Sequence, residues 1–117
     1  MNPNRSPITT HVLDQGQGKP ATGLALVLEK QEGTSWKTLA QAQTDQDGRV
    51  EDLLPKGSQA AAGRYRLTFQ TGAYFQQQGK TTFYPEIAIL FSLENPAQHH
   101  HVPLLLNAFG YSTYRGT

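Results

Sequence analysis

The sequence contains no cysteine, no long apolar run and no block of basic residues. Without cysteine the chain has no disulfide, no thiolate metal ligand and no thiol nucleophile. No apolar run approaches the roughly 20 residues of a membrane-spanning helix, and the opening segment MNPNRSPITT lacks the apolar stretch of a secretion signal. Ten basic residues against nine acidic ones leave no electrostatic signature of nucleic-acid binding. We therefore expect a soluble cytoplasmic protein with no nucleic-acid or membrane partner.

A sustained helical pattern is also missing. Eleven Gly and seven Pro are scattered along the chain, and no stretch keeps an apolar period of about 3.6 residues over several turns. Short segments instead alternate apolar and polar residues, most clearly at residues 64–70, where Tyr65, Leu67 and Phe69 are expected to face inward. The expected strands are residues 8–14, 23–31, 36–44, 64–70, 85–93, a segment that starts at His99, and residues 111–115.

Turn signals separate these segments at intervals of about ten residues. Residues 15–21 are expected to form a turn, and Asp45-Gln46-Asp47-Gly48 a tight turn that delivers Arg49 to a short segment. One short helix, capped by Thr71, is expected within residues 71–79. A chain of 117 residues can bury one core. The sequence thus predicts a single all-β domain over residues 1–117, an antiparallel β-sandwich of seven or eight strands.

Three of the four histidines form the run His99-His100-His101. In a strand that rises ~3.3 Å per residue, His99 and His101 would share one face about 6 to 7 Å apart, while His100 would point the other way. If residues 111–115 form the next strand, Ser112 and Tyr114 share a face as well. One polar face would then carry two imidazoles, a hydroxyl and a phenol.

These residues allow several interpretations. A lone strand histidine such as His11 is usually a surface or structural residue, and the HHH run is simplest as a solvated edge. In one functional interpretation His11, His99 and His101 hold a zinc ion with an open fourth position. In another no metal is present, and a neutral imidazole activates water while Arg49 or Arg115 stabilises an oxyanion.

The remaining candidates have weaker signals. Arg49 alone is a residue that follows a turn, and Tyr114 is simplest as an interface or core aromatic. Ser112 has no evident base beside it in the sequence, and no Gly-x-Ser-x-Gly elbow is present, so a nucleophilic serine is not expected.

Seven short motifs occur in order along nearly the whole chain, namely TTHVLD, GKPA, TDQDGR, TGAYF, FYPE, H-x-HVPLLL and the ending YSTYRGT. In order and spacing they resemble the transthyretin-related 5-hydroxyisourate hydrolases. Members of that family end in Tyr-Arg-Gly-Ser, whereas transthyretin carriers lack both this ending and the histidines. The chain departs from the family pattern at Thr117, where Ser is usual, and at His100, where Tyr is usual. Thr117 keeps a hydroxyl and His100 should face away from the histidine pair, so we expect small effects.

The resemblance implies a transthyretin-like β-sandwich of about eight strands with one short helix. It also implies a homotetramer, a dimer of dimers around a central channel, with sites at the subunit interface. The implied activity is hydrolysis of 5-hydroxyisourate, the product of urate oxidation, to 2-oxo-4-hydroxy-4-carboxy-5-ureidoimidazoline on the way to allantoin, without metal or cofactor. The implied catalytic residues are His11, Arg49 and His101. The implied substrate contacts are His99, Ser112, Tyr114, Arg115, Gly116 and Thr117.

Within this scheme we expect His101, assisted by His11 and Arg49, to deprotonate water. The alternative is a transthyretin-like carrier that holds a small ligand without chemistry. A carrier needs unreactive apolar walls, whereas this chain would place histidines in the channel.

Overall fold

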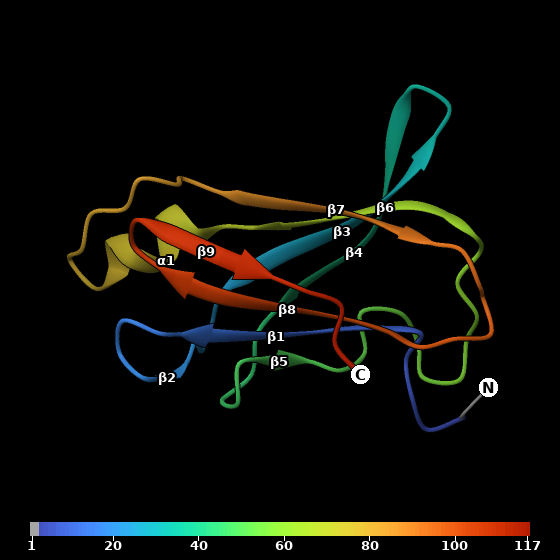
Figure 1. The fold of residues 1–117 in the computed structure, drawn as a ribbon, viewed down its shortest axis with the longest axis horizontal. Coiled ribbons are helices and arrows are strands. Elements are labelled where there is room, and N and C mark those ends of the chain that lie inside the picture. The colour runs from blue at the N-terminus through green and yellow to red at the C-terminus, as the bar shows by residue number, and fades with distance from the viewer. Residues whose placement is uncertain (1–2) are drawn as a thin grey trace.

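Two four- to five-stranded sheets and one short helix make up the fold in the computed structural model, which describes residues 3–117 (Figure 1). One sheet has the order β2-β1-β8-β9, with β5 also paired to β1, and the other has the order β4-β3-β6-β7. The elements are β1 Ile8–Asp14, β2 Lys19–Pro20, β3 Ala25–Glu32, β4 Ser35–Gln43, β5 Arg49–Val50, β6 Gly63–Phe69, α1 Thr71–Gln77, β7 Ile87–Leu93, β8 His100–Asn107 and β9 Gly110–Thr113.

The core lies between the two sheets, as the alternating sequence predicts. Tyr65, Leu67 and Phe69 of β6 are almost fully buried, which confirms the expected inward face of that strand. Ile8 and Val12 of β1 are fully buried opposite them, together with alternate residues of β8. The predicted β-sandwich is therefore confirmed, and the residues between these buried positions form the outer face of the β1–β8 sheet.

One strand pair departs from the purely antiparallel prediction. Strands β1 and β8 are parallel, with Thr9 opposite His101 and His11 opposite Pro103, whereas the other pairs among residues 3–117 are antiparallel. Parallel neighbours need a long crossover connection, which all elements from β2 to β7 supply here. The register places Thr9, His11 and His101 on the outer face of one sheet.

Several expected boundaries shift. Lys19–Pro20 form a two-residue strand against the end of β1, inside what was expected to be a turn. The strand expected over residues 85–93 begins at Ile87, and the strand expected over residues 111–115 is β9, which ends at Thr113. Tyr114 and Arg115 therefore lie beyond the last strand.

The expected helix is present, but its predicted cap is wrong. Thr71 is the first helical residue, and no side chain caps the helix. The Thr71 hydroxyl donates instead to the carbonyl of Tyr84 at 2.9 Å, and the N–H of Gly72 donates to the carbonyl of Pro85 at 2.8 Å. The carbonyl of Pro85, in the segment before β7, thus accepts one of the free N–H groups of the first helical turn in place of a capping side chain.

No helix among residues 3–117 is long and apolar enough to cross a membrane.

Candidate active site

A threonine hydroxyl links the two predicted histidines on the outer face of the β1–β8 sheet. Oγ1 of Thr9 lies 2.7 Å from Nδ1 of His101 and 2.9 Å from Nε2 of His99. The other ring nitrogen of His99, Nδ1, lies 2.8 Å from the carbonyl oxygen of Ser6. The two imidazole centroids are 6.4 Å apart, so the predicted shared face and spacing of His99 and His101 are confirmed.

Arg49 reaches this face through the predicted turn. Oδ1 of Asp45 accepts the N–H groups of Asp47 and Arg49, each at 2.9 Å. Gly48 has φ of 76°, and a Cβ there would lie 2.4 Å from the carbonyl oxygen of Val12, so only glycine lets the turn pack against β1. Immediately after the turn, β5 pairs with β1 so that Arg49 lies directly opposite His11.

The last described residues cross back over His101. The N–H of Gly116 donates to the carbonyl of His101 at 2.9 Å, and a Cβ at Gly116 would lie 2.6 Å from Cδ2 of the imidazole. One residue further, the Thr117 backbone oxygen accepts from Nη2 of Arg5 at 3.3 Å. The segment before β1, which contains Arg5, and the segment after β9, which contains Gly116 and Thr117, thereby meet at His101.

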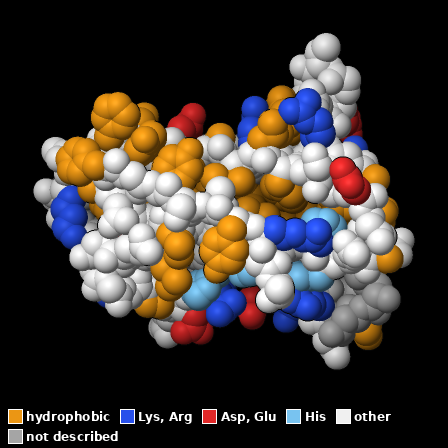
Figure 2. Space-filling view, in the orientation of Figure 1, with side chains coloured by type: hydrophobic (Ala, Val, Ile, Leu, Met, Phe, Trp, Pro, Cys, Tyr) orange, Lys and Arg blue, Asp and Glu red, His pale blue; other side chains and the backbone are white. Residues whose placement is uncertain are grey.

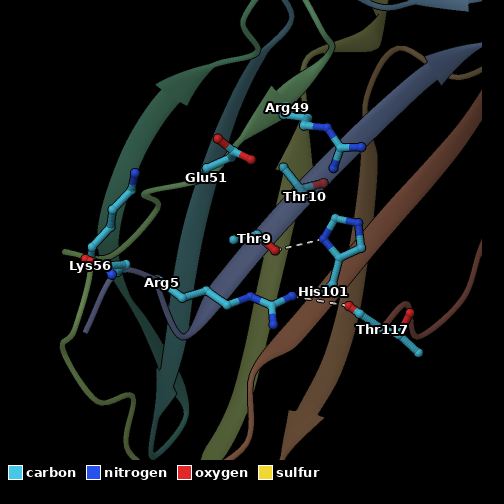
Figure 3. A pocket seen from close by; sticks show the side chains of 9 residues that line it. Arg5, Thr9, Thr10, Arg49, Glu51, Lys56, His101 and Thr117 are labelled. Carbon is cyan, nitrogen blue, oxygen red and sulfur yellow. Dashed lines mark hydrogen bonds between the residues drawn. The ribbon is translucent and has the colours of Figure 1, made fainter. Parts of the chain in front are cut away.

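A cavity of about 190 Å³ opens beside this histidine (Figure 3). Among its lining residues are three that the sequence predicted, Arg49, His101 and Thr117. Six were not predicted as site residues: Asn4, Arg5, Thr9, Thr10, Glu51 and Lys56. Figure 3 shows the imidazole of His101 between the guanidinium groups of Arg49 and Arg5.

The cavity wall is predominantly cationic. Of the Arg, Lys, Asp and Glu side chains that line it, Arg5, Arg49 and Lys56 are cationic and Glu51 is anionic. In Figure 2 basic and histidine side chains gather on the same part of the molecular surface. Such a wall favours an anionic or electron-rich ligand, and the planar fork of an arginine suits adjacent oxygen and nitrogen acceptors.

The other predicted site residues lie outside this cavity. His11 is on the same sheet face but does not line the cavity, and His99 contributes through Thr9. Ser112 pairs with Leu105, which puts it on the outer face but roughly 13 Å along β8 from His101 at ~3.3 Å per residue.

Tyr114 and Arg115 line a separate, more apolar pocket toward β7, which His101 also borders. Outside that pocket, Nη2 of Arg115 donates to Oε1 of Gln98 at 3.1 Å. Gly116 contacts the His101 ring from the backbone rather than from the cavity wall. Tyr114 therefore borders the same second pocket as His101, but neither Tyr114 nor Ser112 lines the cavity that Arg49 and His101 share.

Burial and neighbouring charges lower the pKa of the histidines at the site. The pKa of His101 is lowered chiefly by desolvation, and electrostatic repulsion by His99, Arg49, His11 and Arg5 adds to the effect, the histidines contributing only when they are protonated. Desolvation also lowers the pKa of His99, although the hydrogen bond to Ser6 opposes it. At neutral pH both imidazoles are therefore uncharged, which is the form that accepts a proton or binds a metal.

His100 lies on the other face of β8, as predicted. Its side chain is only 5% exposed, and Nδ1 donates to the carbonyl of Gln98 at 3.0 Å. It takes no part in the cavity beside His101.

The zinc interpretation finds no support in the side-chain geometry. Within residues 3–117 no three His, Cys, Asp or Glu side chains come close enough to hold a metal ion together. Nε2 of His99 and Nδ1 of His101 both lie within hydrogen-bond distance of the Thr9 hydroxyl instead.

Comparison with known proteins identifies the family. The pattern of the HIUase/Transthyretin family matches residues 8–116, which span all of the strands and the helix. The chain belongs to the HIUase/Transthyretin family. Within it the chain is similar to a 5-hydroxyisourate hydrolase of Salmonella dublin, with 47% identity over 94% of this chain and 80% of the relative.

Solved structures of both branches of the HIUase/Transthyretin family superpose on the chain. The 5-hydroxyisourate hydrolase of Klebsiella pneumoniae has a TM-score of 0.83 at 36% identity, covering 94% of this chain and 97% of that one. Transthyretin of Sparus aurata has a TM-score of 0.89 at 31% identity, covering 96% and 97%. The fold is thus common to hydrolase and transthyretin, and only the site can separate the two activities.

Proposed function

We propose that this chain hydrolyses 5-hydroxyisourate to 2-oxo-4-hydroxy-4-carboxy-5-ureidoimidazoline. The observation that carries the proposal is the neutral imidazole of His101 held between Arg49 and Arg5 at a cationic cavity. An acidic, oxygen-rich purine derivative suits such a wall, and a neutral imidazole suits the activation of water. The identity of 47% to a relative named as this hydrolase supports the same reaction.

In the proposed mechanism His101 is the general base. The oxygen of a water molecule bonds to a ring carbonyl carbon of the substrate while one of its protons moves to His101. The carbonyl oxygen becomes an oxyanion, which the Arg49 guanidinium stabilises from the same cavity. Collapse of the intermediate breaks the ring C–N bond, and the proton on His101 passes to the leaving nitrogen. His11, which lies directly opposite Arg49 on β1, helps to orient the water in this proposal.

We also propose the homotetramer, with outer sheet faces meeting around a channel. Three features support it. The cavity, at about 190 Å³, is smaller than the roughly 300 to 1,000 Å³ of most ligand pockets, so a second copy would complete it. Ser112 is exposed on the same outer face, where it would contact substrate in a neighbouring copy. Phe83 and Phe109 are each 70% exposed, and apolar surface of this kind marks interaction sites.

The substrate-contact roles of Tyr114 and Arg115 belong to the same proposal, since neither reaches the cavity of its own chain. A single domain, a cytoplasmic location and the lack of any cofactor stay predictions from the sequence.

A coupled assay tests the function. Urate oxidase generates 5-hydroxyisourate, and its ultraviolet decay is followed with chelator-treated wild type, with His101→Gln and with His100→Gln as the matched control. Acceleration by wild type and His100→Gln, but not by His101→Gln, would support a metal-independent hydrolase that uses His101. If folded wild type leaves the decay unchanged, the carrier becomes the better reading, and acceleration that returns only with added zinc favours the metal mechanism.

A further inference from the structure

The hydrogen bonds around Thr9 run in one direction, and the carbonyl of Ser6 sets that direction. A carbonyl oxygen can only accept, so Nδ1 of His99, 2.8 Å away, must carry a hydrogen and donate it. Ser6 is 1% exposed and lies just before β1, so this acceptor is fixed by the backbone.

The next bond follows from the neutrality of His99. A neutral imidazole carries one ring hydrogen, so with Nδ1 protonated its Nε2 has a lone pair. The hydroxyl of Thr9, 2.9 Å from that nitrogen, must then donate to it. Burial of His99 lowers its pKa and keeps it in this neutral form.

The last bond decides the state of His101. The Thr9 hydroxyl has one hydrogen, and His99 receives it, so Oγ1 can only accept from Nδ1 of His101 at 2.7 Å. The single ring hydrogen of neutral His101 is therefore on Nδ1, and the lone pair is on Nε2. That nitrogen makes no side-chain or backbone hydrogen bond to another residue in the described part of the chain.

We propose that Thr9 and His99 are positioning residues that hold His101 as the tautomer with hydrogen on Nδ1 and the lone pair on Nε2. This inference rests on the proposed function and deepens it, because it says which atom of His101 removes the proton from water. When Nε2 takes that proton, Nδ1–H still donates to Thr9, and the donors still run toward the Ser6 carbonyl. The positive charge that forms on His101 therefore meets acceptors already in place.

The arrangement requires a hydroxyl at position 9. A hydroxyl donates and accepts at the same time, which neither an aliphatic nor an amine side chain does in this geometry. Thr9→Val keeps the shape of the side chain and removes both bonds, whereas Thr9→Ser keeps both bonds. Thr44 offers a matched control, because its exposure of 4% is close to the 8% of Thr9. Its hydroxyl also makes two hydrogen bonds, since it donates to the carbonyl of Ala21 and accepts from the N–H of Leu24. Thr44 does not line the cavity beside His101.

The decisive measurement is the tautomer of His101 without substrate. The protein has four histidines, so long-range 1H–15N spectra of histidine-labelled protein are simple, and His101→Gln assigns the His101 signals. The spectra are recorded about two pH units above the ordinary histidine pKa of ~6.5, where the rings are neutral. We expect hydrogen on Nδ1 in wild type, Thr9→Ser and Thr44→Val, and loss of that preference in Thr9→Val.

Kinetics of the same variants test the consequence. With 5-hydroxyisourate as substrate, Thr9→Val should lose roughly 10²-fold in kcat with little change in KM. A loss of this size is at the lower end of what a general base contributes to the rate. Thr9→Ser should keep most of the wild-type kcat. Hydrogen on Nε2 in wild type, or an unchanged tautomer in Thr9→Val, would overturn the inference. Because the spectra need no substrate, a wild type that fails to hydrolyse 5-hydroxyisourate would refute the proposed function while the tautomer result still stands.

Discussion

Gly116 packs directly against the imidazole of His101, and its N–H holds the carbonyl of the same residue at 2.9 Å. An added Cβ would lie 2.6 Å from Cδ2 of the ring, closer than side-chain carbons approach in real proteins. Because no backbone strain is involved at this glycine, the contact alone requires the absence of a side chain. The position of the candidate base is thus fixed from two directions, by Thr9 and by Gly116.

Gly116→Ala should therefore displace the His101 ring and reduce kcat. Misplacement by about 1 Å costs roughly 10²-fold, and we expect a loss of that order with little change in the midpoint of thermal unfolding. Gly110→Ala is the matched control, because a Cβ there meets nothing within 4 Å, and its activity should equal wild type. Equal activity of both alanine variants would show that the ring tolerates the contact.

The rate of hydrolysis should fall on the acid side of the pH profile. His101 must be neutral to accept a proton, and its pKa is lowered by desolvation and by nearby positive charges. The acid limb of kcat/KM should consequently lie below the ordinary value of about 6.5. Arg49→Gln removes one of those charges and should move the limb to higher pH, besides lowering the rate. Activity that stays constant to about pH 5 in folded protein would argue against histidine as the base.

Stability should also fall in acid. The pKa values of His99, His100 and His101 are all lowered in the folded state, chiefly by burial. The unfolded chain then binds more protons than the folded chain between those lowered values and about 6.5, so the free energy of unfolding decreases as the pH falls through this window. Urea unfolding on both sides of the window measures the change. His100→Gln should show a smaller loss than wild type, and an equal loss would mean that His100 does not contribute.

Arg5 should contribute to substrate binding rather than to chemistry. It lines the cavity and its guanidinium donates to the Thr117 backbone oxygen, but it is exposed. Since exposed charge interactions contribute ~0.2 to 1 kcal/mol, Arg5→Ala should raise KM by about 1.4- to fivefold and leave kcat nearly unchanged. Steady-state kinetics at low and high salt check this, because the difference should shrink as salt screens the charge. Arg64→Ala, on the other sheet, is the control, and an equal rise in KM there would point to a general charge effect.

Much of the fold was predictable because alternation reports burial directly. Tyr65, Leu67 and Phe69 alternate in the sequence and are buried in the structure. The helix cap was not predictable, because Thr71 finds its acceptor at Tyr84, on a segment that the local sequence does not place beside it. The parallel pairing of β1 and β8 was not predicted either, because alternation shows on which face of a strand a residue lies but not which strand is its neighbour.

The candidate site likewise contains residues that strand periodicity predicts and residues that it does not. His99 and His101 share a face as their period-two spacing requires. Thr9 carried an available signal, because it lies two residues before His11 in the expected strand over residues 8–14 and so shares a face with it. Arg5 and Lys56 lie in segments without regular secondary structure, where residue spacing does not predict where a side chain points. The cationic lining of the cavity could therefore not be predicted from the sequence. Tyr114 and Arg115 were misplaced because the last strand ends at Thr113.

The parallel β1–β8 pair also determines when the candidate base, His101, meets Thr9 during synthesis. Thr9 and His101 are 92 residues apart in the chain, so their contact has a very high sequence separation and must close late. While a nascent chain still lacks β8, it already contains Thr9, His11 and Arg49 but no imidazole for Thr9 to orient. Assembly of the candidate active site therefore coincides with docking of β8 beside β1, and we expect a folding intermediate that lacks this docking to be inactive.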